Sequence, residues 1–156
     1  MAIEKVKEYF KQFGIEDKIL EFDVSSATVA LAAEALGCEP ERIAKTLSFK
    51  GEDGCILIVA AGDARVDNKK FKECFGIKAK MPSGDEVEEL CGHAIGGVCP
   101  FAVNEGAKVY LDISLLRFDT VFPACGSSNS AIELTIDELK KYSCCEDKVD
   151  VCKDWQ

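Results

Sequence analysis

A loop that could bind a ligand through its peptide groups is predicted over residues 91–101, which read CGHAIGGVCPF. The adjacent glycines Gly96 and Gly97 have no side chain, so their backbone N–H groups can approach a ligand closely. Pro100 fixes its own φ angle and favours an extended Cys99. This composition is typical of neither a helix nor a strand, and it predicts a cradle of peptide groups for a carbonyl or phosphate oxygen.

Lys45 is the second candidate for chemistry. It lies in the segment 43–47, which is otherwise apolar or hydroxylic and starts a predicted strand. A lysine that faced inward there would be costly to bury unless it met an anion or a polar ligand. The alternative, that Lys45 points to solvent from the other face of the strand, stays open at this point.

A second loop of small residues, Gly-Ser-Ser-Asn, covers residues 126–129. Together with the ammonium group of Lys45 and the glycine loop, it suits a ligand that carries both a phosphate and a carbonyl group. Backbone N–H groups can stabilise the oxyanion that forms during ester cleavage, even when the enzyme supplies no nucleophile. The residues therefore favour a site for a phosphorylated ester.

The single histidine of the chain, His93, lies two residues from Cys91 and leaves two other sites open. One is a Cys–His nucleophile, although a helix is predicted to end between the two residues. The other is a zinc site that adds Cys99 and Cys125, in a spacing that matches no familiar finger or ribbon. We interpret His93 as a loop residue that lines a pocket, and most of the nine cysteines as small buried hydrophobes in a reducing compartment.

These candidates need elements to position them. Apolar periodicity and capping residues predict helices over residues 2–13, 29–37, 40–43, 67–75, 85–91 and 135–142. Alternating or continuous apolar runs predict strands over residues 18–23, 44–49, 55–60, 107–112, 120–124 and 131–134, with a hairpin turn at 51–54. We expect an α+β fold: a single domain with a central mixed, largely antiparallel sheet flanked by helices.

Length and charge limit the function further. A chain of 156 residues corresponds to one domain, which we place at residues 1–143, followed by a frayed C-terminal tail at 144–156. The net charge of −9 argues against a broad nucleic-acid surface, because phosphate binding depends on clustered Lys and Arg. No apolar run is long enough to span a membrane, and the N-terminus has no apolar signal core. We expect a cytoplasmic protein that binds neither membrane nor DNA.

An ordered set of motifs resembles the YbaK/EbsC family, which is related to the editing domain inserted in bacterial prolyl-tRNA synthetases. The set is Gly37, Lys45-Thr-Leu, Gly-Gly-Val-Cys-Pro-Phe at 96–101, Thr120-Val-Phe, Gly126 and Ile132-Glu-Leu. The match covers roughly residues 20–142. It departs from the cysteinyl-tRNA-specific branch, which carries an aspartate where this chain has Ala131 and a serine near Ala124.

The resemblance implies a trans-acting aminoacyl-tRNA deacylase of translation fidelity that uses neither a metal nor a cofactor. Its partners would be the acceptor end of the aminoacyl-tRNA, for tRNA-Pro or another small-amino-acid tRNA, and prolyl-tRNA synthetase. By this resemblance, Lys45, Gly96 and Gly97 would be catalytic. The substrate-binding residues would be Ser26, Thr28, Thr46, His93, Val98, Cys99, Pro100, Gly126, Ser127 and Ser128.

Two other functions remain open. A non-catalytic module of the same fold would bind a nucleotide or a synthetase without turnover. A thiol or metal protein would use Cys91, His93, Cys99 and Cys125.

Overall fold

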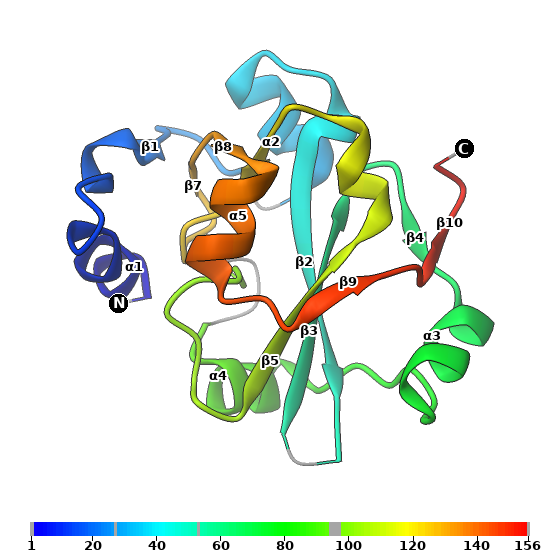
Figure 1. Ribbon diagram of the computed structural model, residues 1–156. Coiled ribbons are helices and arrows are strands. Elements are labelled where there is room, and N and C mark those ends of the chain that lie inside the picture. The colour runs from blue at the N-terminus through cyan, green and yellow to red at the C-terminus, as the bar shows by residue number, and fades with distance from the viewer. Residues whose placement is uncertain (1, 27, 53, 94–97, 156) are drawn as a thin grey trace.

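The computed structural model in Figure 1 describes residues 2–26, 28–52, 54–93 and 98–155. Its centre is a six-stranded sheet with the strand order β8-β6-β2-β3-β5-β9. Two short pairs, β1 with β7 and β4 with β10, lie outside this sheet. The α+β class and the mixed central sheet predicted from the sequence are confirmed.

The elements have the following bounds. The α-helices are α1 (Ala2–Lys11), α2 (Val29–Leu36), α3 (Asn68–Phe75), α4 (Gly84–Cys91) and α5 (Ile136–Ser143), and the 3₁₀ helices are η1 (Glu16–Lys18), η2 (Pro40–Arg42) and η3 (Ile113–Arg117). The strands are β1 (Leu20–Glu21), β2 (Ile43–Lys50), β3 (Cys55–Ala61), β4 (Arg65–Val66), β5 (Ala107–Asp112), β6 (Thr120–Pro123), β7 (Ser130–Ala131), β8 (Leu134–Thr135), β9 (Asp147–Val149) and β10 (Cys152–Lys153).

Local capping signals set the helix starts as predicted. Asp67 accepts hydrogen bonds from two backbone N–H groups at the start of α3. Ser83 and Thr135 each form a capping box, with Glu86 and Glu138 as the third helical residues. Because each cap satisfies backbone donors that the first turn leaves free, these starts depend on neighbouring residues alone.

The hairpin of β2 and β3 forms the middle of the sheet. Every residue of β3 is buried, which confirms that this continuous apolar run is a central strand. The antiparallel register pairs Lys45 with Ala60 and Thr46 with Val59. Lys45 thus lies in the body of the sheet.

The sheet contains more parallel pairing than expected. Antiparallel pairing joins β2 to β3 and β6 to β8, whereas β2–β6, β3–β5 and β5–β9 are parallel. The expectation of a largely antiparallel sheet is therefore wrong. The predicted strand over 131–134 is also divided, since β7 pairs with β1 and β8 pairs with β6.

The C-terminal segment is ordered as part of the fold. Figure 1 shows β9 running along β5, and β10 reaching β4 on the opposite side of the molecule from α1. Asp112, which is fully buried, accepts hydrogen bonds from the backbone N–H groups of Ser114 at 3.0 Å and Val151 at 2.9 Å. The expectation of a frayed tail over residues 144–156 is therefore wrong: β9 forms the edge of the six-stranded sheet, and β10 pairs with β4 outside it.

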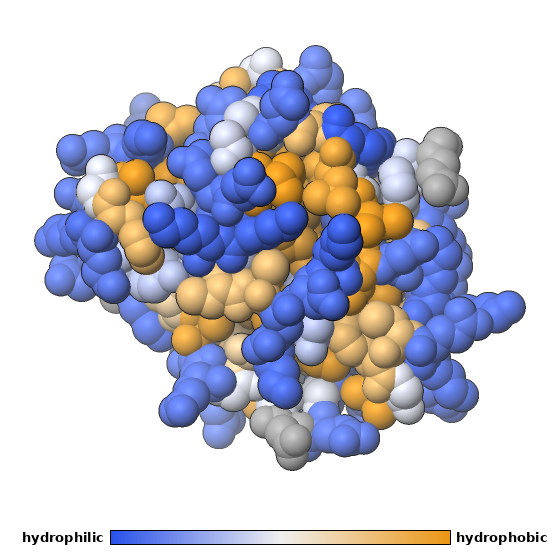
Figure 2. Space-filling model, in the orientation of Figure 1, coloured by the Kyte–Doolittle hydropathy of each residue, from blue (hydrophilic) through white to orange (hydrophobic). Residues whose placement is uncertain are grey.

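Helix packing closes the other side of the core. Phe10 of α1 lies between Phe101 and Tyr142, with ring centroids 4.9 Å and 5.9 Å away. None of the helices in the described part of the chain is long and apolar enough to cross a membrane. Figure 2 shows a face covered mainly by hydrophilic residues, with apolar residues gathered toward its centre.

Replacing Asp112 by Ala tests the anchoring of the C-terminal segment. The substitution leaves two buried N–H donors without a partner, so we expect the free energy of unfolding to fall by about 2–4 kcal/mol. Urea denaturation measures this change. Asp150→Ala is the control, because Asp150 is exposed and pairs with Lys70 at the surface; it should change stability little. Equal effects of the two substitutions would contradict the assignment.

Candidate functional site

A cavity of about 380 Å³ opens beside the N-terminal half of β2. Its walls come from the start of α2, from β2, from the segment before α4, from Val98, and from β6 and β7. The lining residues are Ser26, Thr28, Val29, Ala32, Ile43, Ala44, Lys45, Thr46, Leu47, Ser48, Met81, Pro82, Val87, Val98, Phe122, Ala124, Ser130 and Ala131. Most of these side chains are apolar, with a few hydroxyl groups, which is typical of a small-molecule site.

Local sequence explains the shape of the cavity. Thr28 caps α2 by accepting a hydrogen bond from the backbone N–H of Leu31 at 3.2 Å, which fixes where the helix starts. The small side chains of Ala32, Ala44 and Ala131 then leave space between α2, β2 and β7. The capping box at Ser83 starts α4, which places Val87 on the opposite wall.

Lys45 is the one charged side chain among the described residues that line the cavity. Its Nζ donates a hydrogen bond to the carbonyl oxygen of Gly62 at 3.4 Å. Burial lowers the pKa of Lys45, and the charge of Asp63 opposes this shift. An ammonium group that a neutral carbonyl holds in a mostly apolar cavity keeps its charge available for an anionic or carbonyl ligand. The inward orientation is thus the one that the structure has.

Thr46 offers a second polar atom next to Lys45. Its Oγ1 is buried and has no hydrogen-bond partner among the described residues. A buried hydroxyl without a partner is uncommon in proteins, and Thr46 is one of the residues that line the cavity.

Only part of the predicted glycine loop over residues 91–101 belongs to the described residues. Gly96 and Gly97 lie outside the described residues. Val98 lines the cavity, whereas Cys99 and Pro100 are buried and are not among the lining residues.

His93 is not among the residues that line the cavity, and it contacts the other end of its loop. The side chain is fully buried, and Nε2 lies 2.7 Å from the carbonyl oxygen of Phe101 and 3.5 Å from the sulfur of Cys99. The Nε2–H therefore donates to Phe101. Burial lowers the pKa of His93 and raises the pKa of the Cys99 thiol to about 12, so both groups are uncharged at neutral pH.

The Cys–His and zinc alternatives gain no support from this geometry. Cys91 donates its S–H to the backbone carbonyl of His93 at 3.6 Å, rather than meeting the imidazole ring. Burial raises the pKa of Cys91 and of Cys125, which disfavours the reactive thiolate. In the ranges that the structure describes, no three His, Cys, Asp or Glu side chains are arranged to hold a metal ion.

The loop at Gly126, Ser127 and Ser128 hydrogen-bonds to residues that line the cavity. Gly126 has a φ of +92°, a left-handed conformation that favours glycine. The carbonyl of Ser128 accepts a hydrogen bond from the N–H of Ser26 at 2.6 Å. Ser127 donates toward Ser130 at 2.7 Å. The loop therefore positions Ser26 and Ser130, which do line the cavity.

Several lining residues were missed by sequence reasoning, among them Phe122 and Ser130. Phe122 is held by Arg42, whose guanidinium lies 5.0 Å from the ring centroid and pairs with Glu133 at 3.1 Å. The parallel pairing of β2 with β6 brings Phe122 opposite Ile43. No local signal predicts that pairing, because the two strands are far apart in the sequence.

Lys45→Met tests the cost of the buried ammonium. Because the pKa of Lys45 is lower in the folded than in the unfolded chain, the folded state binds fewer protons between the two values, and wild-type stability rises with pH there. At pH 7 we expect the variant to be at least as stable as the wild type. Urea denaturation should show this difference shrinking as the pH approaches 10.5, the ordinary lysine pKa. A large loss of stability would contradict the assignment.

Comparisons with known proteins identify the family of this chain. The family model of the aminoacyl-tRNA editing domain matches residues 24–142. The uncharacterized protein YwhH of Bacillus subtilis is 57% identical over 157 residues, covering 100% of both chains. The crystal structure of a candidate trans-editing enzyme for prolyl tRNA synthetase is 31% identical, with a TM-score of 0.87 over 97% of both chains.

The proline–tRNA ligase of Kosmotoga olearia is 29% identical over 103 residues, which are 64% of this chain and 18% of the ligase. The chain thus corresponds to a small part of that enzyme. These matches confirm the resemblance drawn from the sequence motifs: the chain belongs to the aminoacyl-tRNA editing domain family.

Proposed function

We propose that this protein is a trans-acting deacylase, which hydrolyses the ester between a wrong amino acid and the terminal adenosine of a tRNA. The observation that carries the proposal is the ammonium group of Lys45, the one charged group among the described residues that line a cavity of about 380 Å³. This volume lies at the lower end for small-molecule sites, so the cavity suits the end of a larger substrate.

Lys45 is proposed to bind the terminal adenosine, at its phosphate or ribose oxygens. A lysine ammonium is a compact charge with three donors, and the Gly62 carbonyl accepts one of them at 3.4 Å. Thr46, whose buried Oγ1 has no partner in the described part of the chain, would bind the substrate beside it.

The hydrolytic step is proposed to use water as the nucleophile. The described lining residues include no Asp, Glu or His that could act as a general base. The 2′-hydroxyl of the substrate ribose would then help to orient the water. As the oxygen–carbon bond forms, the ester C–O bond breaks, and the proton passes to the leaving 3′-oxygen. Backbone N–H groups of residues 96–98 would stabilise the oxyanion.

The amino-acid pocket is proposed to take a small side chain. Val29, Ala32 and Ala131 line the cavity with apolar surface. The likeness to a candidate trans-editing enzyme for prolyl tRNA synthetase and to a proline–tRNA ligase supports tRNA-Pro as the carrier. In an apolar pocket, one methylene group changes the binding free energy by about 1–3 kcal/mol. The size of the amino-acid side chain would therefore decide which ester is cleaved.

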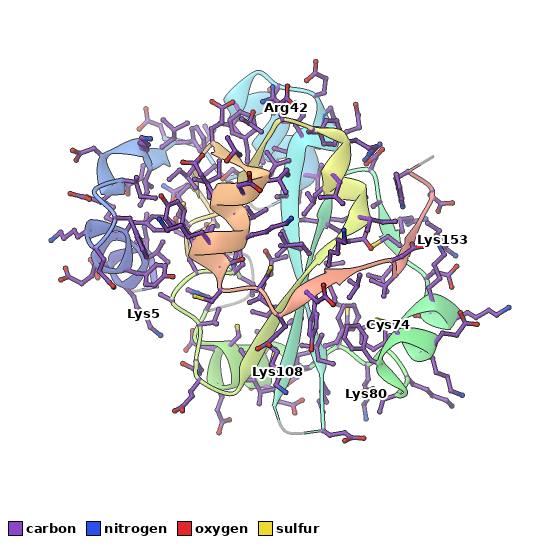
Figure 3. The ribbon with its side chains drawn as sticks, in the orientation of Figure 1. Lys5, Arg42, Cys74, Lys80, Lys108 and Lys153 are labelled. Atoms are coloured by element: carbon purple, nitrogen blue, oxygen red, sulfur yellow. The ribbon has the colours of Figure 1, made fainter. Side chains whose placement is uncertain are left out.

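Contact with the tRNA is proposed to be limited to its acceptor end. The chain has a net charge of −9. Figure 3 shows Arg42 at the top of the molecule, Lys5 at the lower left, Lys80 and Lys108 at the bottom and Lys153 at the right. Since affinity for a nucleic-acid backbone depends on clustered cations, a synthetase partner would supply part of the tRNA binding.

The test is deacylation of prolyl-, alanyl-, cysteinyl-, seryl- and threonyl-tRNA by the wild type and by Lys45→Ala. We expect rapid loss of one ester, and a rate about 10²–10³-fold lower for the variant. Lys50→Ala is the matched control, because Lys50 lies on the same strand but pairs with Glu86 at 2.9 Å, so it should retain activity.

Failure of the folded wild type to cleave any of the five esters would contradict the proposal. That result would instead favour the binding module, in which a nucleotide or synthetase stabilises the protein without turnover.

A further inference from the structure

The turn that holds Lys45 is fixed tightly. The N–H of Ala64 donates to the carbonyl of Ala61 at 3.0 Å, which closes the turn after β3 around Gly62 and Asp63. A Cβ atom at Gly62 would lie 2.0 Å from the carbonyl oxygen of Pro40. The Gly62 carbonyl accepts the hydrogen bond from Lys45, and the close approach of Pro40 leaves no space for a side chain at this position.

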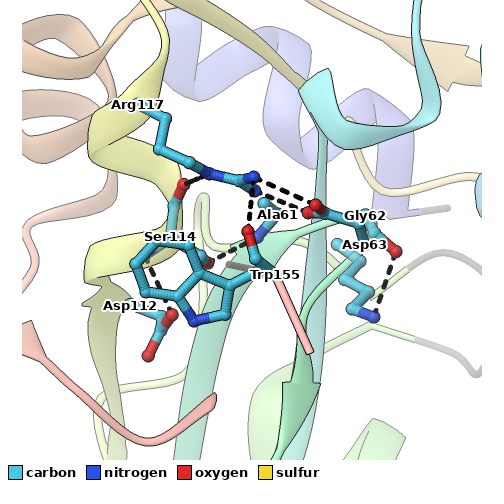
Figure 4. Close-up of polar contacts among 8 residues, drawn as sticks. Ala61, Gly62, Asp63, Asp112, Ser114, Arg117 and Trp155 are labelled. Atoms are coloured by element: carbon cyan, nitrogen blue, oxygen red, sulfur yellow. Dashed lines mark hydrogen bonds and ion pairs between the residues drawn. The ribbon is translucent and has the colours of Figure 1, made fainter. Parts of the chain in front are cut away.

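Arg117 of η3 holds the same turn from its other side. Its Nη2 and Nη1 atoms contact the two carboxylate oxygens of Asp63 at 2.5 Å and 3.0 Å. Nε donates to the carbonyl of Ser114 at 2.8 Å, and Nη1 also donates to the carbonyl of Trp155 at 3.0 Å. Figure 4 shows this bidentate pair, with the backbone of Ala61 and Gly62 beside it.

The guanidinium group is also covered on its faces. It lies 4.8 Å from the ring centroid of Phe118 and 5.0 Å from that of Trp155. From the same 3₁₀ helix, the hydroxyl of Ser114 accepts a hydrogen bond from the N–H of Ala61 at 3.1 Å. The C-terminal segment and η3 together therefore hold both ends of the pair in place.

Asp63 is the carboxylate that acts on Lys45. The charged or titratable groups that affect Lys45 electrostatically are Cys152, Asp63 and Arg65. Burial raises the pKa of Cys152 far above its ordinary value, so this thiol is neutral. A carboxylate next in sequence to Gly62, if it were not paired, would compete with the substrate for the ammonium group.

We propose that Arg117 is a positioning residue: its bidentate pair with Asp63 keeps this carboxylate from pairing with Lys45 and fixes the Gly62 carbonyl. As a result, the Lys45 ammonium faces the cavity and stays available to the substrate. The catalytic consequence rests on the proposed deacylase function, whereas the effect on Lys45 itself does not.

The first test compares Arg117→Gln, Asp63→Asn and the double variant by deacylation kinetics. Arg117→Gln keeps the aliphatic stem and releases Asp63, so we expect kcat/KM to fall about tenfold, mainly through a higher KM. Asp63→Asn keeps a hydrogen-bond acceptor and should stay within about threefold of the wild type. The double variant should recover most of the loss, because no free carboxylate remains.

The variants should behave differently if the pair of Arg117 and Asp63 only stabilises the fold. If the double variant is as impaired as Arg117→Gln, or if Asp63→Asn alone is equally impaired, the proposal is overturned. Arg117→Lys keeps the positive charge but cannot form the bidentate pair, so its activity should lie between that of Arg117→Gln and that of the wild type. The single variant Asp63→Asn and Arg117→Lys keep the test decisive if Arg117→Gln does not fold.

The second test does not depend on activity. ¹³C NMR of the lysine Cε groups, with the Lys45 signal assigned through Lys45→Met, follows the protonation of Lys45 in each variant. In Arg117→Gln the released carboxylate should raise the pKa of Lys45, and in the double variant the pKa should return toward or below the wild-type value. An unchanged Lys45 titration in Arg117→Gln would overturn the proposal, even if deacylation is observed. The expected titration shift without deacylation by the wild type would instead reject the proposed function alone.

Discussion

The constraint on which the rest of the structure depends is one partly buried ammonium group, which is the single charge among the described residues that line the cavity. Burial lowers the pKa of Lys45, so the fold holds a charge where water solvates it poorly. The partner that holds it is a neutral backbone carbonyl, at Gly62. A carboxylate partner would stabilise the ammonium charge better, but it would also compete with a ligand for the same ammonium group. The arrangement thus sacrifices stability at Lys45 for the ability to bind a ligand.

The sheet provides the rigidity that such a site needs. Lys45 lies on β2, which pairs with the fully buried β3 on one side and with β6 on the other. Asp112 ties the end of β5 to Val151 and to η3, and η3 contacts the turn that holds Lys45 through Ser114. The C-terminal segment therefore belongs to the support of the site, although it lies beyond the residues 24–142 that match the editing family.

Features set by neighbouring residues could be predicted from the sequence. The caps at Thr28, Asp67, Ser83 and Thr135 define helix starts, and the hairpin of β2 and β3 follows from two apolar runs and a short turn. The parallel pairings of the sheet could not be predicted, because they join strands that are distant in the sequence. The strand β9 was missed for the same reason: its three residues have weak strand character, and only β5 provides their partners.

The residues predicted for the candidate site fall into those that line the cavity and those that do not. Ser26, Thr28, Lys45, Thr46 and Val98 do lie at the cavity, while Gly96 and Gly97 fall outside the described residues. The cavity lining does not include the other predicted residues, which are His93, Cys99, Pro100, Gly126, Ser127 and Ser128. Two of them, Ser127 and Ser128, hydrogen-bond to the lining residues Ser130 and Ser26. Residue type and spacing indicated segments that border the cavity. Which side chain reaches the cavity depends on nonlocal packing, and the catalytic roles remain predictions.

The most direct measurement of the central claim is backbone NMR during titration with an adenosine 5′-monophosphate that carries a small amino acid in a non-hydrolysable 3′-amide. If the cavity at Lys45 binds the end of an aminoacyl-tRNA, the shifts should concentrate at Lys45, Thr46, Ala131 and Val98 and should disappear in Lys45→Met. Shifts that centre on another part of the surface, or that persist unchanged in Lys45→Met, would contradict the account.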